Sequence, residues 1–309
     1  GRYSGGWDKL REERYARMKN LGVIRKDTPL SPRNEKVPTW DDAEHKEWQQ
    51  RRMEVYSAQV DVMDQGIGQI IEALKASGRF ENTLIMFMID NGGCHVEYDK
   101  DRKGDFLPGK TRSGGPMRPG NLPHIMPGPE DTYQSYGYGW ANASNTPFRY
   151  FKQHDHEGGI HTPMIAHWPK GIEGKGAVTF QLASLIDIMP TSLELSGCKY
   201  PSKFKGNTIY PQDGQSLVPI FQGRQRPEPK ALFFTNARGK AIRKGEWKMV
   251  AIRGSGKKAK GKKPATNWEL YNIASDPAEL NDLAKKNPTK IKELSTDYNQ
   301  WIKMSAARE

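Results

Sequence analysis

An unbroken apolar run of six residues, 84–89, constrains the fold of this chain more than any other feature of its sequence. It follows a segment at 41–77 in which apolar side chains recur at steps of three and four, which predicts one long helix that Gly78 can end. A short, continuously apolar strand after a helix is typical of a parallel sheet covered on both faces. A long helix followed by such a strand therefore predicts a doubly wound α/β domain.

Beyond this strand the sequence predicts one long loop region and then a separate group of short elements. Residues 93–146 are rich in Gly, Pro, Asp, Asn and Tyr without a sustained period, which indicates a long ordered excursion over the surface. Loops of that length are uncommon unless they are functional. A strand at 164–166 and a helix at 182–195 complete the larger part.

The character of the sequence changes after about residue 221. Short strand candidates separated by turns precede an amphipathic helix at 291–304. We therefore expect residues 226–309 to form a small α+β subdomain, an antiparallel sheet with one helix packed on it. The strand candidates are 231–235, 241–243, 247–252 and 268–271.

The composition is that of a globular protein, since 309 residues with 35% hydrophobic residues and 8 Trp can bury a sizeable core. No stretch approaches the ~18–20 consecutive apolar residues of a membrane helix, so no membrane span is predicted. The net charge of +12 raises the question of a nucleic-acid partner. Part of that charge is local, in Lys248 and five lysines of the Gly-interrupted run 254–264, which indicates a flexible solvated loop. No aromatic residues alternate with these lysines to stack bases, so nucleic acid is not predicted.

The cysteines and the first residues leave the cellular compartment open. Cys94 and Cys198 have no C-x-x-C spacing, so a structural zinc site built from cysteine is not expected, while a disulfide between them stays open. Residues 1–5 contain neither an initiator Met nor the charged and apolar regions of a signal peptide. We therefore expect the chain to be truncated.

Polar residues that suit a ligand site follow the apolar strand directly. Asp90, Asn91, Gly92 and Gly93 come after Ile89, and ligands of open α/β sheets bind at the carboxyl ends of strands. Asp and Asn offer hard oxygen ligands for Ca²⁺ or Mg²⁺, and glycine lets the backbone approach a ligand closely. The alternative, from these residues alone, is an Asx-type turn in which the two side chains bond to their own backbone.

A second candidate site residue is Lys152, shortly before another double glycine in the segment 157–159. A lysine held there can bind an oxyanion as a point charge, and an ordinary solvated lysine is the alternative. His154, His156 and His161 in the same stretch raise the question of zinc. Their spacing does not match a helical H-E-x-x-H, so no zinc site is predicted.

At these residues the sequence resembles the arylsulfatases of the alkaline-phosphatase-like superfamily, over almost the whole chain. Residues 90–92 are similar to the family's S-D-N-G metal motif, with Ile89 in place of the usual Ser or Thr. Residues 145–163, which contain Lys152, are similar to its sulfate-lysine segment; His161 stands where many relatives have Arg or a small residue, and we assign it no role. Further similar stretches are 6–11, 21–24, 63–68, 82–83, 185–191, 213–217, 270–272 and 276–277 with Glu279.

The resemblance implies an α/β fold, a partial alkaline-phosphatase-like sandwich, with residues 1–225 as the C-terminal part of the catalytic domain and 226–309 as the small subdomain. It implies that Asp90 and Asn91 are metal ligands for Ca²⁺, with Mg²⁺ as the alternative, and that Lys152 contacts the sulfate of an ester such as a sulfated carbohydrate. A fixed cation and a lysine would stabilise the negative charge on the sulfuryl oxygens in the transition state. Relatives are often exported, so a periplasmic or secreted location is expected.

The nucleophile of the family, a formylglycine made from Cys or Ser in a C/S-x-P-x-R motif, has no counterpart here. Neither Cys94 nor Cys198 has Pro two residues on and Arg four residues on. The resemblance therefore implies a fragment of a sulfuric ester hydrolase, with the formylglycine upstream of this chain and no activity of the fragment alone.

Two rival functions stay open. An upstream Ser or Thr nucleophile outside a C/S-x-P-x-R context would favour a phosphodiesterase or phosphatase of the same superfamily. Salt-sensitive binding of heparin-like polymers that survives Asp90→Ala would favour a non-catalytic protein that binds sulfated polyanions through its basic surface.

Overall fold

The computed structural model describes residues 1–101, 107–236, 239–252 and 267–306. The lysine-rich run at 254–264, predicted to be a solvated loop, lies outside them. None of the helices in the described part is long and apolar enough to cross a membrane.

The helices are α1 (Gly6–Asn20), α2 (Lys46–Ala76), α3 (Gly137–Ser144), α4 (Glu157–Ile160), α5 (Ile188–Ser196), α6 (Val218–Phe221) and α7 (Pro288–Ala306), with 3-10 turns at Phe80–Asn82, Leu185–Asp187 and Ala284–Lys286. The strands are β1 (Ile85–Met88), β2 (Arg118–Pro119), β3 (Thr132–Tyr133), β4 (Met164–His167), β5 (Lys203–Phe204), β6 (Asn207–Thr208), β7 (Leu232–Thr235), β8 (Gly239–Lys244), β9 (Trp247–Ile252) and β10 (Glu269–Asn272).

The long helix predicted at 41–77 is confirmed as α2, which begins five residues later, at Lys46. Its start is delayed because His45 has a left-handed backbone, with φ of 52°. The helix ends where the sequence predicts, just before Gly78, whose φ of +68° suits glycine.

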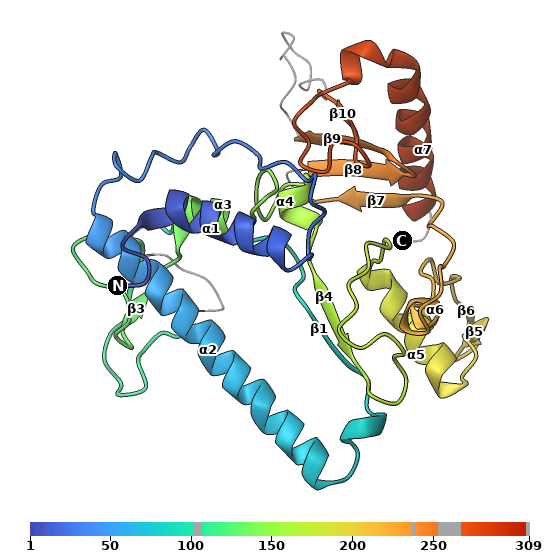
Figure 1. Cartoon of the computed structure of the whole chain (residues 1–309), viewed down its shortest axis with the longest axis horizontal. Helices are drawn as coiled ribbons and strands as arrows, with labels where there is room; N and C mark the ends of the chain where they lie inside the picture. Colours follow the sequence, from blue (N-terminus) through green and yellow to red (C-terminus); the bar gives the residue numbers. More distant parts are fainter. Residues whose placement is uncertain (102–106, 237–238, 253–266, 307–309) are drawn as a thin grey trace.

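The strand predicted at 84–89 exists as β1, but its predicted partner and burial are wrong. β1 pairs with β4 in an antiparallel sheet of two strands, with Ile85 opposite His167 and Met88 opposite Met164. The pair is not covered on both faces, since Phe87 is 37% exposed. An apolar run indicates a strand but not the direction of its neighbour, and here the chain returns to β1 through a long segment that contains β2, β3, α3 and α4. Figure 1 shows α2 and α5 on opposite sides of this pair.

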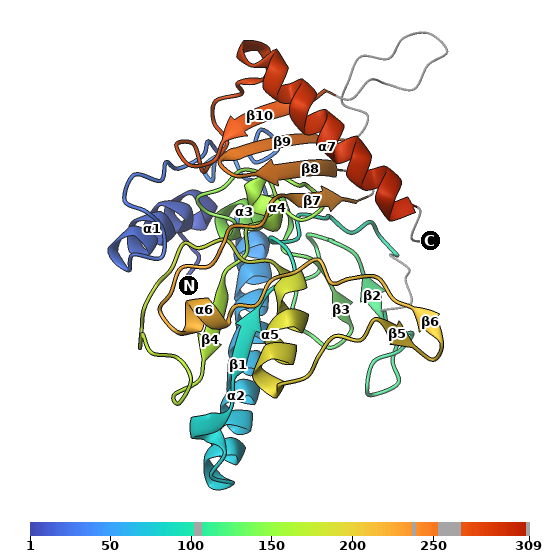
Figure 2. The same ribbon diagram turned by 90° about the vertical axis from the view of Figure 1, so that its right-hand side faces the viewer.

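The C-terminal antiparallel sheet with one helix is confirmed. Its strand order is β10-β9-β8-β7, and Leu294 and Tyr298 of α7 pack on one face with Ile242, Met249 and Leu270. Because side chains alternate along a strand, the neighbours of these residues form a second buried cluster on the other face. That cluster contains Ala241, Val250, Tyr271 and Ile273. In both views α4 lies between this sheet and the adjacent ends of β1 and β4 (Figures 1 and 2).

A second core forms near the N-terminus around Trp140 of α3, which is fully buried. The rings of Trp7 and Trp40 pack edge to face, and Trp7 contacts Trp140 in the same way, with ring centroids 5.5 Å apart. The sequence does not predict α3, because Gly137 and Gly139 obscure a helix of eight residues. Burial of Trp140 against α1 supplies the stabilisation that local propensity lacks.

Candidate active site

Asp90 and Asn91 follow β1 at the surface of the molecule, as the sequence predicts for ligand-binding residues. The side-chain amide of Asn91 donates a hydrogen bond to Asp90 Oδ1 at 2.6 Å. This bond joins the two side chains, whereas an Asx-type turn would bond them to their own backbone. A carboxylate and a carboxamide therefore lie together at the end of the strand.

These oxygens suit a hard divalent cation in type, and they can supply part of its coordination shell. Ca²⁺ in proteins takes 6–8 oxygen ligands, and Mg²⁺ takes six. Within the described residues no three or more His, Cys, Asp and Glu side chains gather as a metal site. A cation held by Asp90 and Asn91 would need its remaining ligands from water, from a substrate or from other polypeptide.

Backbone hydrogen bonds join the turn after Asn91 to the segment that contains Lys152. The Gly92 N–H donates to the Gly159 carbonyl at 2.9 Å, and the Lys152 N–H donates to the Gly93 carbonyl at 3.1 Å. Antiparallel pairing is the cause, because it places the end of β1 beside the start of β4 and the chain before it. The structure thus brings together the metal-ligand candidates and the lysine that the sequence predicts for one site.

The double glycines allow these two segments to touch. A Cβ atom on Gly92 would lie 1.8 Å from the Gly158 carbonyl oxygen, and one on Gly158 would lie 2.1 Å from the Arg149 carbonyl oxygen. The sequence predicts that Gly92 and Gly93 let the backbone approach a ligand closely. The close approach that the structure shows is between two stretches of backbone.

Lys152 sits in a loop whose backbone is held in unusual conformations. Tyr150 and Gln153, on either side of it, have left-handed φ angles of 63° and 77°. Such angles cost free energy in residues other than glycine and persist where the surroundings impose them. Asn145 helps to impose them, since its side chain accepts a hydrogen bond from Gly93 N–H at 2.8 Å and donates one to the Tyr150 carbonyl at 3.1 Å.

The ammonium of Lys152 is available to an anion. The side chain is partly buried, and no carboxylate of the described residues lies within ion-pair distance of it. An ordinary surface lysine would be more exposed and would sit on an unconstrained backbone. Lys152 thus differs from an ordinary solvated lysine in its burial and in the constraint on its backbone.

His156 and His161 in this segment contact glutamates. His156 Nε2 lies 2.9 Å from Glu269 Oε2 in β10, and His161 Nδ1 lies 2.7 Å from Glu157 Oε2. Burial would raise the pKa of Glu269, but its hydrogen bonds to His156 and Tyr271 and the nearby Arg149 lower it to about 2. The His156–Glu269 contact connects the Lys152 segment to the C-terminal sheet, whereas the His161–Glu157 contact lies within the segment.

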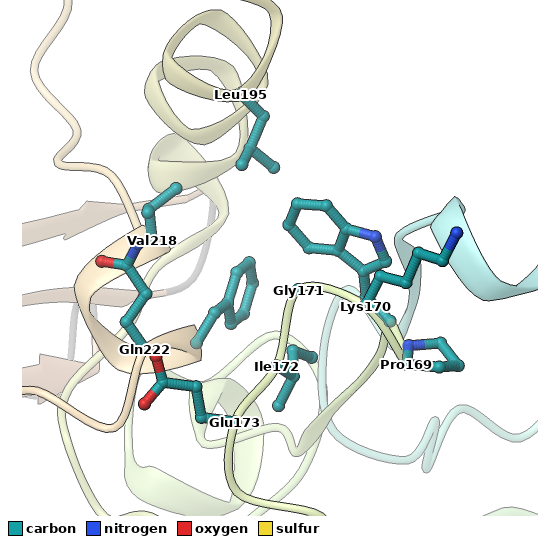
Figure 3. A pocket seen from close by; sticks show the side chains of 10 residues that line it. Pro169, Lys170, Gly171, Ile172, Glu173, Leu195, Val218 and Gln222 are labelled. Carbon is teal, nitrogen blue, oxygen red and sulfur yellow. The ribbon is translucent and has the colours of Figure 1, made fainter.

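A pocket of about 430 Å³ lies at the opposite end of β4, between the turn after Trp168, the end of α5 and α6 (Figure 3). Figure 3 shows Leu195, Val218 and Ile172 on its wall. Asp90, Asn91 and Lys152 do not line it. The candidate site is thus separate from this pocket, on the other end of the strand pair.

Sequence families match the chain across the site. Residues 148–305 match the family described as N-sulphoglucosamine sulphohydrolase, C-terminal. Residues 25–198, more than half of the chain, match the family described as Sulfatase, and this match contains Asp90, Asn91 and Lys152. The chain belongs to the sulfatase family.

Individual relatives of this sulfatase chain agree. It is 32% identical over 305 residues to an uncharacterised sulfatase of Schizosaccharomyces pombe, a match that covers 95% of the chain and 51% of the relative. It is 31% identical over 229 residues to an arylsulfatase of Klebsiella aerogenes, covering 73% of the chain and 47% of that protein. The chain therefore spans about half the length of these curated relatives.

Solved structures confirm the fold class predicted from sequence. A protein named Ps i-CgsB matches with a TM-score of 0.51 at 23% identity, covering 96% of the sulfatase chain and 54% of that protein. A Bacteroides thetaiotaomicron protein described in connection with glycosaminoglycan metabolism matches with a TM-score of 0.50 at 22% identity, covering 77% and 42%. The fold is alkaline-phosphatase-like, a mixed α/β structure with a C-terminal antiparallel sheet and helix.

Sequence reasoning missed Asn145 as a residue that supports the site, and it misplaced Lys248. Lys248 was grouped with solvated lysines, but it is fully buried and paired with Glu157 and Glu279. The sequence signal for the burial of Lys248 was its position as the single charged residue inside the predicted apolar strand 247–252. Cys94 and Cys198, whose pairing the sequence leaves open, are both free thiols.

Proposed function

We propose that this sulfatase chain supplies the sulfate-binding lysine and two of the metal ligands of a sulfuric ester hydrolase. One observation carries the proposal: backbone bonds hold the turn after Asp90 against the loop that contains Lys152, a lysine with no carboxylate of the described residues within ion-pair distance. Membership of the sulfatase family supports hydrolysis of sulfate esters in general. Asp90, Asn91 and Lys152 are the side chains to which we assign roles in that reaction.

Asp90 and Asn91 would hold Ca²⁺, with Mg²⁺ as the alternative, because both offer hard oxygen ligands. A bound divalent cation supplies a fixed positive charge for the sulfuryl oxygens. Lys152 would bind those oxygens from the neighbouring loop and stabilise their charge as the ester bond breaks. The constrained backbone around Lys152 would hold the base of this side chain in place before the substrate arrives.

The nucleophile in this proposal is a formylglycine outside residues 1–309, since the sequence contains no C/S-x-P-x-R motif. The described chain alone is expected not to turn over. We further propose that residues 1–225 belong to the catalytic α/β domain and residues 226–309 to a smaller subdomain. Export to the periplasm or the exterior is the expected location.

The proposed substrate class is a sulfate monoester, with a sulfated carbohydrate as the favoured example. The match of residues 148–305 to the C-terminal family of N-sulphoglucosamine sulphohydrolase supports a sugar substrate. The arylsulfatase of Klebsiella aerogenes makes a small aryl sulfate the alternative.

The test compares an aryl sulfate, a sulfated amino sugar and an aryl phosphodiester as substrates of a polypeptide that contains this chain together with a formylglycine segment. Sulfate release that is lost in a chelator and restored by Ca²⁺ supports the proposal. A preference for the phosphodiester favours a phosphodiesterase of the same superfamily. Absence of turnover, with salt-sensitive binding to a sulfated polymer, favours a non-catalytic binding protein.

A further inference from the structure

A buried group of three charges lies between the C-terminal sheet and α4. Lys248 of β9 is 0% exposed, and its Nζ lies 2.6 Å from Glu157 Oε1 and 2.8 Å from Glu279 Oε1. Both carboxylates are buried as well. Charges removed from water are costly unless they are paired, so each member of this group restricts the position of the others.

The same group holds together the two ends of the loop that contains Lys152, which we call the neck of the loop: Arg149 on one side and residues 157–158 on the other. The loop closes where the Gly158 N–H donates to the Arg149 carbonyl at 2.9 Å. Glu279 contacts both sides of this closure: its carboxylate accepts from the Glu157 N–H at 2.8 Å, and its carbonyl accepts from the Arg149 guanidinium at 2.5 Å. Lys248 in turn fixes the Glu279 carboxylate.

The charge of Lys248 is what keeps the two carboxylates together. Burial would lower the pKa of Lys248, but Glu157 and Glu279 raise it above its ordinary value, so the side chain stays an ammonium. Burial would raise the pKa of Glu157, but Lys248 and His161 hold it well below its usual range. Without the ammonium, two like charges would face each other in the interior and would have to separate or take up a proton.

We propose that Lys248 is a positioning residue for Lys152, acting from the C-terminal sheet through Glu157 and Glu279. Its charge holds the neck of the loop closed, and the closed loop keeps the Lys152 amide bonded to Gly93. This inference rests on the proposed role of Lys152 in sulfate binding. Through Lys248, the C-terminal subdomain would help to position Lys152 in the active site.

The experiment measures amide hydrogen exchange in the 309-residue chain. Lys248→Met keeps much of the side-chain volume and removes the charge. We expect the amides of Gly92, Lys152 and Gly158 to exchange at least about tenfold faster, while Met249 in the sheet is unchanged. The matched control is Lys244→Met in β8, whose lysine is 41% exposed and pairs with Glu293 and Asp297 of α7. It should leave the loop amides as they are.

A second variant separates charge from packing. Lys248→Met/Glu279→Gln removes one positive and one negative charge, so the like-charge pair no longer exists. Exchange of the loop amides should return to within about threefold of the wild type. If the double variant exchanges as fast as Lys248→Met, the lysine acts through packing and the proposal is overturned. Unchanged loop amides in Lys248→Met, or equal acceleration of all amides, also overturn it.

Glu157→Gln carries the test if Lys248→Met does not fold, because it leaves Lys248 paired with Glu279. Faster exchange confined to the loop amides supports the proposal, and no local change overturns it. Exchange rates do not depend on sulfate hydrolysis. A Lys152→Ala variant with normal turnover would therefore remove the proposed function without altering the result for Lys248.

Discussion

The backbone N–H of Lys152 donates a hydrogen bond to the carbonyl of Gly93, at 3.1 Å. It joins the lysine to the turn that directly follows Asp90 and Asn91. The neighbouring bond from Gly92 to Gly159 fixes the same two segments at a second point. The relative position of the lysine and the metal-ligand candidates is therefore set by backbone contacts, before any ligand binds.

Gly92→Ala should separate the two segments. Its new Cβ would lie 1.8 Å from the Gly158 carbonyl oxygen, so the backbone must shift. We expect a loss of about 1–3 kcal/mol in the free energy of unfolding, measured by urea denaturation. Gly68→Ala is the matched control, because its Cβ meets no atom within 4 Å and alanine favours the helix, with an expected gain of about 0.5–1 kcal/mol. Equal stability of Gly92→Ala and the wild type would contradict the close backbone contact between Gly92 and Gly158.

Asn145→Ala should loosen the turn after Asn91. The variant loses the acceptor for the Gly93 N–H and the donor to the Tyr150 carbonyl, which we expect to cost about 1–3 kcal/mol. The specific readout is faster hydrogen exchange of the Gly93 amide. Asn142→Ala, at another buried asparagine of the same region, should leave that amide unchanged. The same exchange rate in both variants would argue against a special role for Asn145.

Much of the fold can be predicted from local signals. The helical period of α2, the apolar run of β1, and the strands and helix of the C-terminal subdomain all carry their information within a few residues. The partner of β1 is different, because an apolar strand does not encode the direction of its neighbour. Local signals also fail to predict helix α3, since its stability comes from the burial of Trp140 and not from the helix propensity of its residues.

The candidate site shows the same division. Asp90 and Asn91 stand out because they end a strand, and Lys152 gains its significance from the family resemblance. The backbone bonds that hold their segments together depend on the antiparallel return of the chain, which no local pattern shows. The burial of Lys248 depends on two glutamates from distant segments, so charge counting along the sequence assigned it to the solvent.

Glu269 should contribute to acid sensitivity. Its folded-state pKa of about 2 lies below its ordinary value of 4.5, so its stabilising contribution is present above about pH 4.5 and is lost as the pH falls towards 2. The contribution at neutral pH is on the order of 3 kcal/mol as an upper limit. Glu269→Gln should flatten the decline of unfolding free energy between pH 4.5 and 2, and Glu228→Gln at an exposed site should not. If the free energy of unfolding of Glu269→Gln falls between pH 4.5 and 2 as steeply as that of the wild type, the pairing of Glu269 with His156 is contradicted.

Asp90→Asn should weaken metal dependence. The substitution keeps the size of the side chain and one carbonyl oxygen, replaces the other oxygen with an NH2 donor, and removes the negative charge that favours a divalent cation. In an active preparation, we expect the Ca²⁺ concentration for half-maximal activity to rise at least about tenfold. Asp61→Asn, on the exposed surface of α2, serves as the control. An identical Ca²⁺ requirement in Asp90→Asn and the wild type would remove Asp90 from the metal site.

The most direct test of the account is the sulfatase activity of Lys152→Ala, measured as kcat/KM for a sulfate ester in a polypeptide that contains this chain and a formylglycine segment. Lys170→Ala, at the opposite end of β4, is the matched control. Loss of a fixed charge that contacts the sulfuryl oxygens predicts a decrease of about 10²- to 10³-fold in Lys152→Ala and little change in Lys170→Ala. Near wild-type kcat/KM in a folded Lys152→Ala enzyme would contradict the assignment of Lys152 to the sulfate site.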